Sequence, residues 1–211
     1  MDKISKSAGQ DNKPELKGFS NGVKELVDKS PTLSRKLKSL EDDGWDIKYG
    51  ELKQGSYVDR KDKLMVIDSV QKATNAGVVQ SLAHESGHAT FKLEAIIPAE
   101  GKTKGEYVYG NTNRHLNDEG EATLNNLEVR EEIIENGGKD IGIAGVEMES
   151  YKKIYSKYKK HKDRIKARKE IGEIFADGEK PSIDPTKTYK AYYAAPYKAY
   201  WEQHIQPKFE K

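Results

Sequence analysis

Cysteine is absent from the 211 residues of this chain. Its absence excludes a disulfide scaffold, a thiolate metal site and a cysteine nucleophile, and it leaves the redox compartment open. Long hydrophobic runs are also missing. No apolar stretch approaches the roughly 18 residues that a transmembrane helix needs, so no such helix is expected. Nor is there a large excess of one charge, since 37 Lys and Arg oppose 35 Asp and Glu for a net charge of +2. So small an imbalance argues against a nucleic acid as the main partner.

The first residues, MDKISKSAGQDNKPE, mix charged, small and polar side chains without an apolar centre. We therefore expect no secretory signal there. Residues 1–20 show no periodicity and are predicted to form a flexible arm or linker. Residues 21–211 are numerous enough to bury one substantial core, and a single domain is expected over that range.

A helix and a small antiparallel sheet are predicted in the first third of the chain. Ser30 can cap a helix over 31–43, and Pro31 suits its first position. The short strands, recognised by alternating or apolar residues, are expected at residues 45–49, 56–59 and 64–68. A helical pattern then covers 74–93.

The second half of the chain is predicted to be mainly helical, which together with the sheet gives an α+β fold. A long loop is expected over 98–116, because proline, glycine and asparagine are frequent there. A helix should follow from about residue 117 or 118 to Asn136, where two glycines end it. The remaining helices are expected in the lysine-rich segment 147–174 and the tyrosine-rich tail 186–205.

The segment His84-Glu85-Ser86-Gly87-His88 has the pattern H-E-x-x-H. Residues four apart lie on one face of a helix, so both imidazoles can bind the same Zn²⁺ ion. Glu85 is rotated away from them and can reach a water on the metal, where it would act as the catalytic base without being a ligand. The competing interpretation is a helix with two surface histidines and no metal.

A catalytic zinc usually takes three protein ligands and a water, so a third ligand must lie downstream. No histidine follows His88 at the spacing H-x-x-G-x-x-H. The candidates are His115 and the acids Asp118, Glu119 and Glu121, which lie at the expected start of the next helix. Acids are also common there because they favour the dipole at the N-terminus of a helix.

The HESGH segment, followed 31 residues after His88 by Glu119-Gly120-Glu121-Ala122, resembles the gluzincin class of zinc metallopeptidases. Several gluzincin-like families place the ligand glutamate in an E-x-x-A pattern, which maps onto Glu119 and Ala122, with Glu121 as its competitor. The resemblance implies a zincin-like fold whose small sheet packs on the active-site helix. It also implies Zn²⁺ held by His84, His88 and Glu119, and Glu85 as the catalytic base.

A wider resemblance runs from residue 31 to about residue 134. The order SPTLSRKLKSLEDDGWDIKYG, SYVDR, LMVIDS, LAHESGHA and EGEATLNN is similar to metallopeptidase toxin domains at the C-termini of bacterial polymorphic toxins and type VI secretion spike or Rhs effectors. This resemblance implies a protein or peptide substrate and delivery into a target cell, with periplasm and cytoplasm both open. It also implies a cognate immunity protein, which we expect to cover the cleft or the 98–116 loop.

Other polar residues are candidates for supporting positions, although ordinary structure explains each of them at least as well. Those that could stabilise an oxyanion are Tyr107, Tyr109 and His115. Those that could accept a hydrogen bond from a ligand imidazole are Asp68, Asn125 and Asn126.

An alternative to an enzyme is a binding module that uses the basic helix and the tyrosine-rich tail, with zinc structural or absent. The basic run from Lys152 to Lys169 could contact nucleic acid or anionic lipid. We interpret it first as a solvated helix face with acids four residues away. The tail is interpreted as a helix that packs its rings on the domain.

Overall fold

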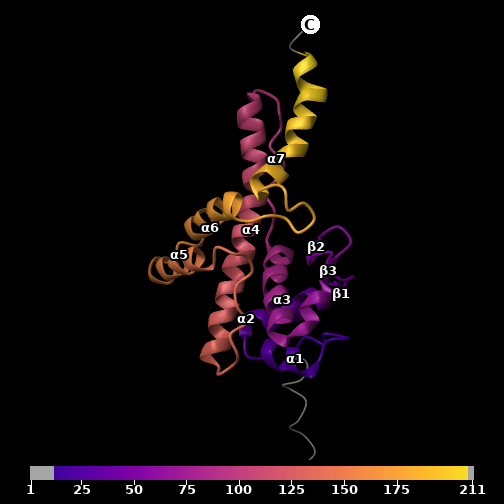
Figure 1. Cartoon of the computed structure of the whole chain (residues 1–211), viewed down its shortest axis with the longest axis vertical. Helices are drawn as coiled ribbons and strands as arrows, with labels where there is room; N and C mark the ends of the chain where they lie inside the picture. The colour runs from indigo at the N-terminus through magenta and orange to yellow at the C-terminus, as the bar shows by residue number, and fades with distance from the viewer. Residues whose placement is uncertain (1–11, 209–211) are drawn as a thin grey trace, which may run out of the picture. The chain divides into compact units, whose positions relative to one another are not determined.

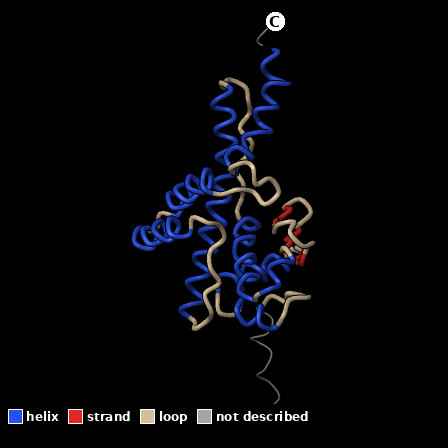
Figure 2. Tube along the Cα trace, viewed as in Figure 1, coloured by secondary structure: helices blue, strands red, loops and turns tan. Residues whose placement is uncertain are grey.

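The computed structural model describes residues 12–208 and has an α+β fold with seven α-helices and one small sheet in that range. Figures 1 and 2 show how much of the chain is helical. The chain divides into two compact units, and helix α4 (Lys104–Glu135) contributes to both. Unit 1 comprises the described residues up to Thr90 together with Asn125–Ala144, and unit 2 comprises Phe91–Leu124 and the described residues from Gly145 on. None of the described helices is both long and apolar enough to cross a membrane.

Unit 1 begins with two capped helices, α1 (Asn21–Val27) and α2 (Pro31–Asp42). The Ser30 hydroxyl accepts from the Leu33 N–H at 3.0 Å and Pro31 opens the helix, as predicted. Helix α1 was not predicted; its short length leaves only Val23 and Val27 as a buried stripe. Residues 1–11 of the predicted arm lie outside the described residues, whereas Leu16 and Phe19 are buried in the core of this unit.

The sheet has three short strands, namely β1 (Asp46–Tyr49), β2 (Tyr57–Asp59) and β3 (Leu64–Ile67). Their positions match the predicted ones, but the predicted antiparallel arrangement is wrong. The order is β1-β3-β2, with β1 parallel to the central β3 and β2 antiparallel to it. Alternation reveals which face of a strand is buried but not the direction of its neighbour, so the sheet's mixed pairing was not visible in the sequence.

Helix α3 (Asn75–Thr90) packs against α1, α2 and the strands β2 and β3, and most of its residues from Val78 to Gly87 are buried. The C-terminal half of α4 completes this core with Val129 and Ile133. Glu132 ties α4 to the start of α2, because its carboxylate accepts hydrogen bonds from Ser30, Thr32 and the Thr32 backbone.

Unit 2 is built from the N-terminal half of α4 and helices α5 (Met148–His161), α6 (Arg164–Gly178) and α7 (Tyr189–Tyr200). The basic segment was predicted as one helix, but it breaks after α5. Lys162 adopts a left-handed backbone with φ of 58°, and Asp163 then caps α6 by accepting from the Lys166 N–H. The tail forms α7, as predicted, and continues into a π-helical turn at Trp201–Ile205.

The predicted loop over 98–116 is correct only as far as Thr103 and wrong beyond it, because α4 begins at Lys104. Asn111 is fully buried, and its side-chain amide bonds both the N–H and the C=O of Ile97. Gly110 leaves room for Ile97, whose Cδ1 would lie 2.5 Å from a Cβ at that position. The residues that suggested a loop therefore serve the packing of segment 91–103 along the helix.

Glycines allow α4 and α6 to cross in close contact. A Cβ on Gly120 would lie 2.1 Å from the carbonyl oxygen of Arg168, and one on Gly172 would lie 2.5 Å from that of Leu116. Real Cβ atoms do not approach backbone this closely, so both positions require glycine for the observed crossing.

Candidate metal centre

The HESGH segment lies in the interior of α3, whose packing against the unit 1 core fixes its orientation. His84 and Glu85 are buried, and His88 is half-buried. Neither histidine is a fully exposed side chain, so the surface placement in the competing interpretation is wrong, whereas metal binding stays a prediction. Glu85 follows His84 by about 100° around the helix, so its carboxylate leaves α3 in a different direction from the two imidazoles.

The two imidazoles point toward each other as the four-residue spacing predicts. Their Nε2 atoms lie 3.2 Å apart, and their rings meet edge to face with centroids 4.9 Å apart. The two ring nitrogens are thus close enough together to bind one ion.

Among the described residues, one group of three side chains could hold a metal ion: His84, His88 and Glu119, whose ligand atoms lie within 4.8 Å of one another. Glu119 is buried on α4, six residues before Asn125 on the same uninterrupted helix. A donor set of two imidazoles and one carboxylate is a common way for proteins to bind a divalent transition metal.

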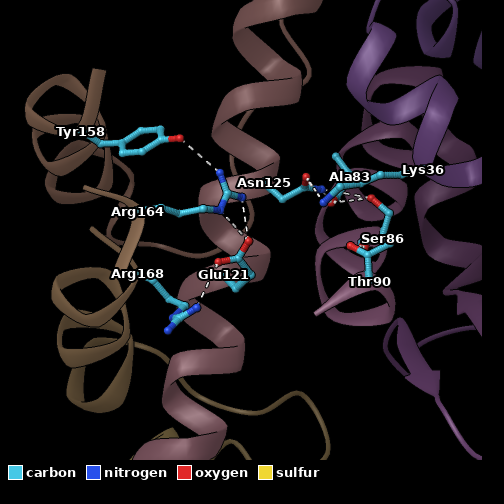
Figure 3. A network of polar contacts seen from close by, with 9 residues as sticks. All are labelled: Lys36, Ala83, Ser86, Thr90, Glu121, Asn125, Tyr158, Arg164 and Arg168. Carbon is cyan, nitrogen blue, oxygen red and sulfur yellow. Dashed lines mark hydrogen bonds and ion pairs between the residues drawn. The ribbon is translucent and has the colours of Figure 1, made fainter. Parts of the chain in front are cut away.

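Asn125 attaches α4 directly to the motif helix within unit 1 (Figure 3). Its side-chain N–H groups donate to the carbonyl oxygen of Ala83 at 2.5 Å and to the hydroxyl of Ser86 at 3.1 Å. Its Oδ1 accepts from Lys36 at 2.7 Å. Asn125 therefore bonds the backbone of the residue before His84 rather than an imidazole. Its two bonds to α3 fix the position of this part of α4 along the axis of α3.

Arg60 holds the C-terminal end of the motif helix. Its Nε and Nη2 donate to the carbonyl oxygen of His88 at 3.1 and 2.7 Å. The last carbonyls of a helix lack intrahelical partners, and a guanidinium satisfies them while it also favours the helix dipole. This contact fixes the backbone of a candidate ligand.

Glu121, the competitor of Glu119, is engaged elsewhere in unit 2 (Figure 3). Its Oε1 accepts from Nε and Nη2 of Arg164 at 2.8 and 2.7 Å, and its Oε2 lies 3.8 Å from Nη1 of Arg168. Arg168 in turn lies over the ring of Phe91, with Cζ 4.8 Å from its centroid. These contacts account for Glu121 as a structural acid.

Tyr193 on α7 was missed as a site residue. Its hydroxyl donates to Oε1 of Glu119. Burial raises the pKa of this phenol well above its usual range, and the adjacent Glu119 carboxylate raises it further, so Tyr193 remains a hydrogen-bond donor. In the sequence only the helical spacing of the tyrosines was visible, and that spacing predicts packing rather than a bond to one particular acid.

The three aromatic candidates from the expected loop, His115, Tyr107 and Tyr109, have different surroundings in the structure. His115 stacks on Tyr193 with centroids 4.7 Å apart, and its Nε2 lies 2.9 Å from the hydroxyl of Tyr197. Tyr107 is buried against Tyr197, whereas Tyr109 is 68% exposed. His115 thus belongs to the polar aromatic cluster around Tyr193, within unit 2, and is not part of the three-residue metal group.

Asp68 and Asn126 have structural partners in unit 1. The Asp68 carboxylate accepts from the N–H groups of Lys53, Gly55 and Val70. Burial opposes its ionisation, but these three backbone donors outweigh it and lower the pKa of Asp68. Asn126 bonds the backbone of Gly142 and Ala144.

The chain was compared with protein-family models, curated proteins and solved structures. No protein-family model matches the chain, and neither a curated protein nor a solved structure matches it.

Proposed function

We propose that this chain is a zinc-dependent metallopeptidase that hydrolyses peptide or related amide bonds. The observation that carries the proposal is the convergence of His84, His88 and Glu119 beside the acid Glu85, which follows the first histidine on α3. Three protein ligands are the number found in catalytic zinc sites, where the fourth position is kept for water or substrate.

The donor geometry fits zinc. Two nitrogen ligands at about 2.05 Å from a tetrahedral Zn²⁺ are separated by about 3.3 Å. The two Nε2 atoms lie 3.2 Å apart, close to that separation. Tyr193 fits as well, because a ligating carboxylate commonly has its other oxygen hydrogen-bonded by a neighbouring side chain.

Bound Zn²⁺ would polarise the substrate carbonyl and lower the pKa of water toward about 7. Glu85 takes a proton from the attacking water onto its carboxylate and delivers it to the leaving amine. Its buried position on α3 shields the carboxylate from bulk solvent. His84, His88 and Glu119 hold the reacting centre, and Tyr193 fixes the orientation of Glu119.

The proposal includes a biological role, in which the chain acts as the toxin domain of a bacterial effector delivered into a target cell. Support comes from the ordered resemblance over residues 31–134, from the buried Glu85 and His84, and from the half-buried His88. A producer of such a hydrolase needs a specific inhibitor, so a cognate immunity protein is part of the proposal. Its expected contact with a 98–116 loop is withdrawn, because residues from Lys104 on are helical.

The experiment expresses the chain in bacteria, once without and once with an added export signal. Wild type should arrest growth in one compartment, and Glu85→Gln should abolish the arrest while it retains bound zinc. Glu25→Gln, a change of the same chemistry on the exposed face of α1, is the matched control and should remain toxic. Equal growth of wild type and Glu85→Gln in both compartments would contradict the toxin proposal, and cleavage of a peptide library by purified protein tests the peptidase separately.

A further inference from the structure

The small net charge of the chain conceals a strongly basic segment. Residues 152–169 contain ten Lys and Arg and one acid, Asp163, which gives +9. Because the whole chain carries +2, all its other residues together carry −7. Positive charge is therefore concentrated on α5, the turn after it and the start of α6, all within unit 2.

Part of this charge is neutralised inside unit 2. Arg164 and Arg168 lie against the buried Glu121, and Lys152 pairs with Glu149 at 2.7 Å. By contrast, three exposed lysines on α5 have no ion-pair partner among residues 12–208; they are Lys153, Lys157 and Lys160. We call these three the α5 lysine face.

The spacing of the α5 lysine face is unfavourable for a helix that only meets water. Its members are separated by four and three residues and so project from the same side of α5. Like charges at these spacings repel and destabilise a helix. Elsewhere the chain pairs such a lysine with an acid four residues away, as in Lys38 and Asp42 on α2. On α5 an acid stands four residues before Lys153, but this acid, Glu149, pairs with Lys152. The uncompensated lysines therefore indicate an external negative partner.

We infer that the α5 lysine face binds the anionic headgroups of a lipid bilayer. Lysine is a compact, hydrated charge without the bidentate fork of arginine, which suits a diffuse layer of charge better than recognition of individual phosphates. Ile165, five residues after Lys160 at the start of α6, is 59% exposed and offers an apolar side chain to a bilayer. Single-stranded nucleic acid would require exposed rings for stacking, yet Tyr155 is buried and Tyr158 is half-buried on this helix. Clusters of lysine on an amphipathic helix are typical of binding to anionic membranes.

The test is sedimentation of the full chain with vesicles of phosphatidylcholine alone or mixed with phosphatidylglycerol. Binding is expected only to the mixed vesicles and should weaken as salt rises. Each lysine near an anionic surface changes partitioning about fivefold, so Lys153→Gln Lys157→Gln Lys160→Gln should reduce it about a hundredfold. The matched control carries the same charge change at exposed positions outside the face: Lys61→Gln, Lys102→Gln and Lys139→Gln.

The control variant should bind nearly as well as wild type, and thermal unfolding verifies that both variants are folded. Equal loss in the two variants would overturn the proposal, because it would mean that net charge rather than this face governs binding. No preference for phosphatidylglycerol would overturn it as well. A DNA duplex that binds through the same lysines and displaces the chain from vesicles would identify a nucleic acid as the partner and reject the lipid. The inference does not depend on the metal site.

Discussion

The hydroxyl of Tyr193 donates a hydrogen bond to Oε1 of Glu119, the carboxylate that α4 contributes to the metal group. The bond restricts rotation of the Glu119 side chain. It also connects α7, the tyrosine-rich helix, to the chemistry proposed for this chain.

Removal of that hydroxyl should weaken metal binding without unfolding the protein. Tyr193→Phe keeps the ring that stacks on His115, and we expect it to lower zinc affinity about tenfold. Titration against a competing chelator measures the effect. Tyr192→Phe, on the neighbouring residue of the same helix, is the control and should bind zinc like wild type. Equal affinities in all three proteins would contradict a supporting role for Tyr193.

The acids Glu119 and Glu121 should fail in different ways. Glu119→Gln should lose zinc and keep the fold, because it removes the negative charge of the proposed ligand group. Glu121→Gln should keep zinc but lower the free energy of unfolding by about 2 kcal/mol, since it leaves Arg164 and Arg168 without their buried acid. Metal analysis and urea unfolding of both variants check this. Zinc loss in Glu121→Gln alone would reverse the assignment.

The close crossing of α4 and α6 should not tolerate a methyl group. Gly120→Ala introduces a Cβ against the Arg168 carbonyl, and we expect a loss of about 1–3 kcal/mol in unfolding free energy. Gly105→Ala, in the same helix, has no atom closer than 3.9 Å and should be neutral or slightly stabilising. Denaturant midpoints compare the two, and similar values would argue against the crossing.

Asp68 should make the stability of unit 1 dependent on pH. Its pKa is lowered in the folded state, so its stabilisation is complete above an unfolded value of about 3.9 and disappears as the pH falls through the folded value. Asp68→Asn should therefore be about 1–2 kcal/mol less stable than wild type at neutral pH. Thermal unfolding from neutral to strongly acidic pH measures the difference, which should shrink toward zero in acid. A difference that is constant with pH would contradict the linkage.

The local parts of the site could be predicted from the sequence because they depend on helical spacing. The four-residue interval places His84 and His88 on one face wherever a helix forms, and the Ser30 and Pro31 pair defines the start of α2. The E-x-x-A pattern favoured Glu119 over Glu121, and the metal group contains Glu119. That Glu119 is a ligand remains a prediction.

The parts that could not be predicted depend on contacts between distant residues. Asn111 suggested a loop, yet its amide is fully used by Ile97 and Tyr107, which makes it a buried helix residue. The bond from Tyr193 to Glu119 joins residues 74 apart, and no local pattern encodes it. Helix breaks are equally hard to locate, because Lys162 ends α5 by adopting a left-handed backbone that lysine rarely takes.

The most direct test of the central claim is the metal content of the purified chain, measured by mass spectrometry of the wild type and of His84→Ala His88→Ala. A catalytic zinc site predicts about one zinc per chain in the wild type and none in the double variant, with circular dichroism showing that both are folded. Glu85→Gln should retain the same zinc as wild type, because its side chain is outside the ligand set. Equal zinc in the wild type and the double variant, or a folded wild type that binds no zinc when it is supplied, would contradict the account.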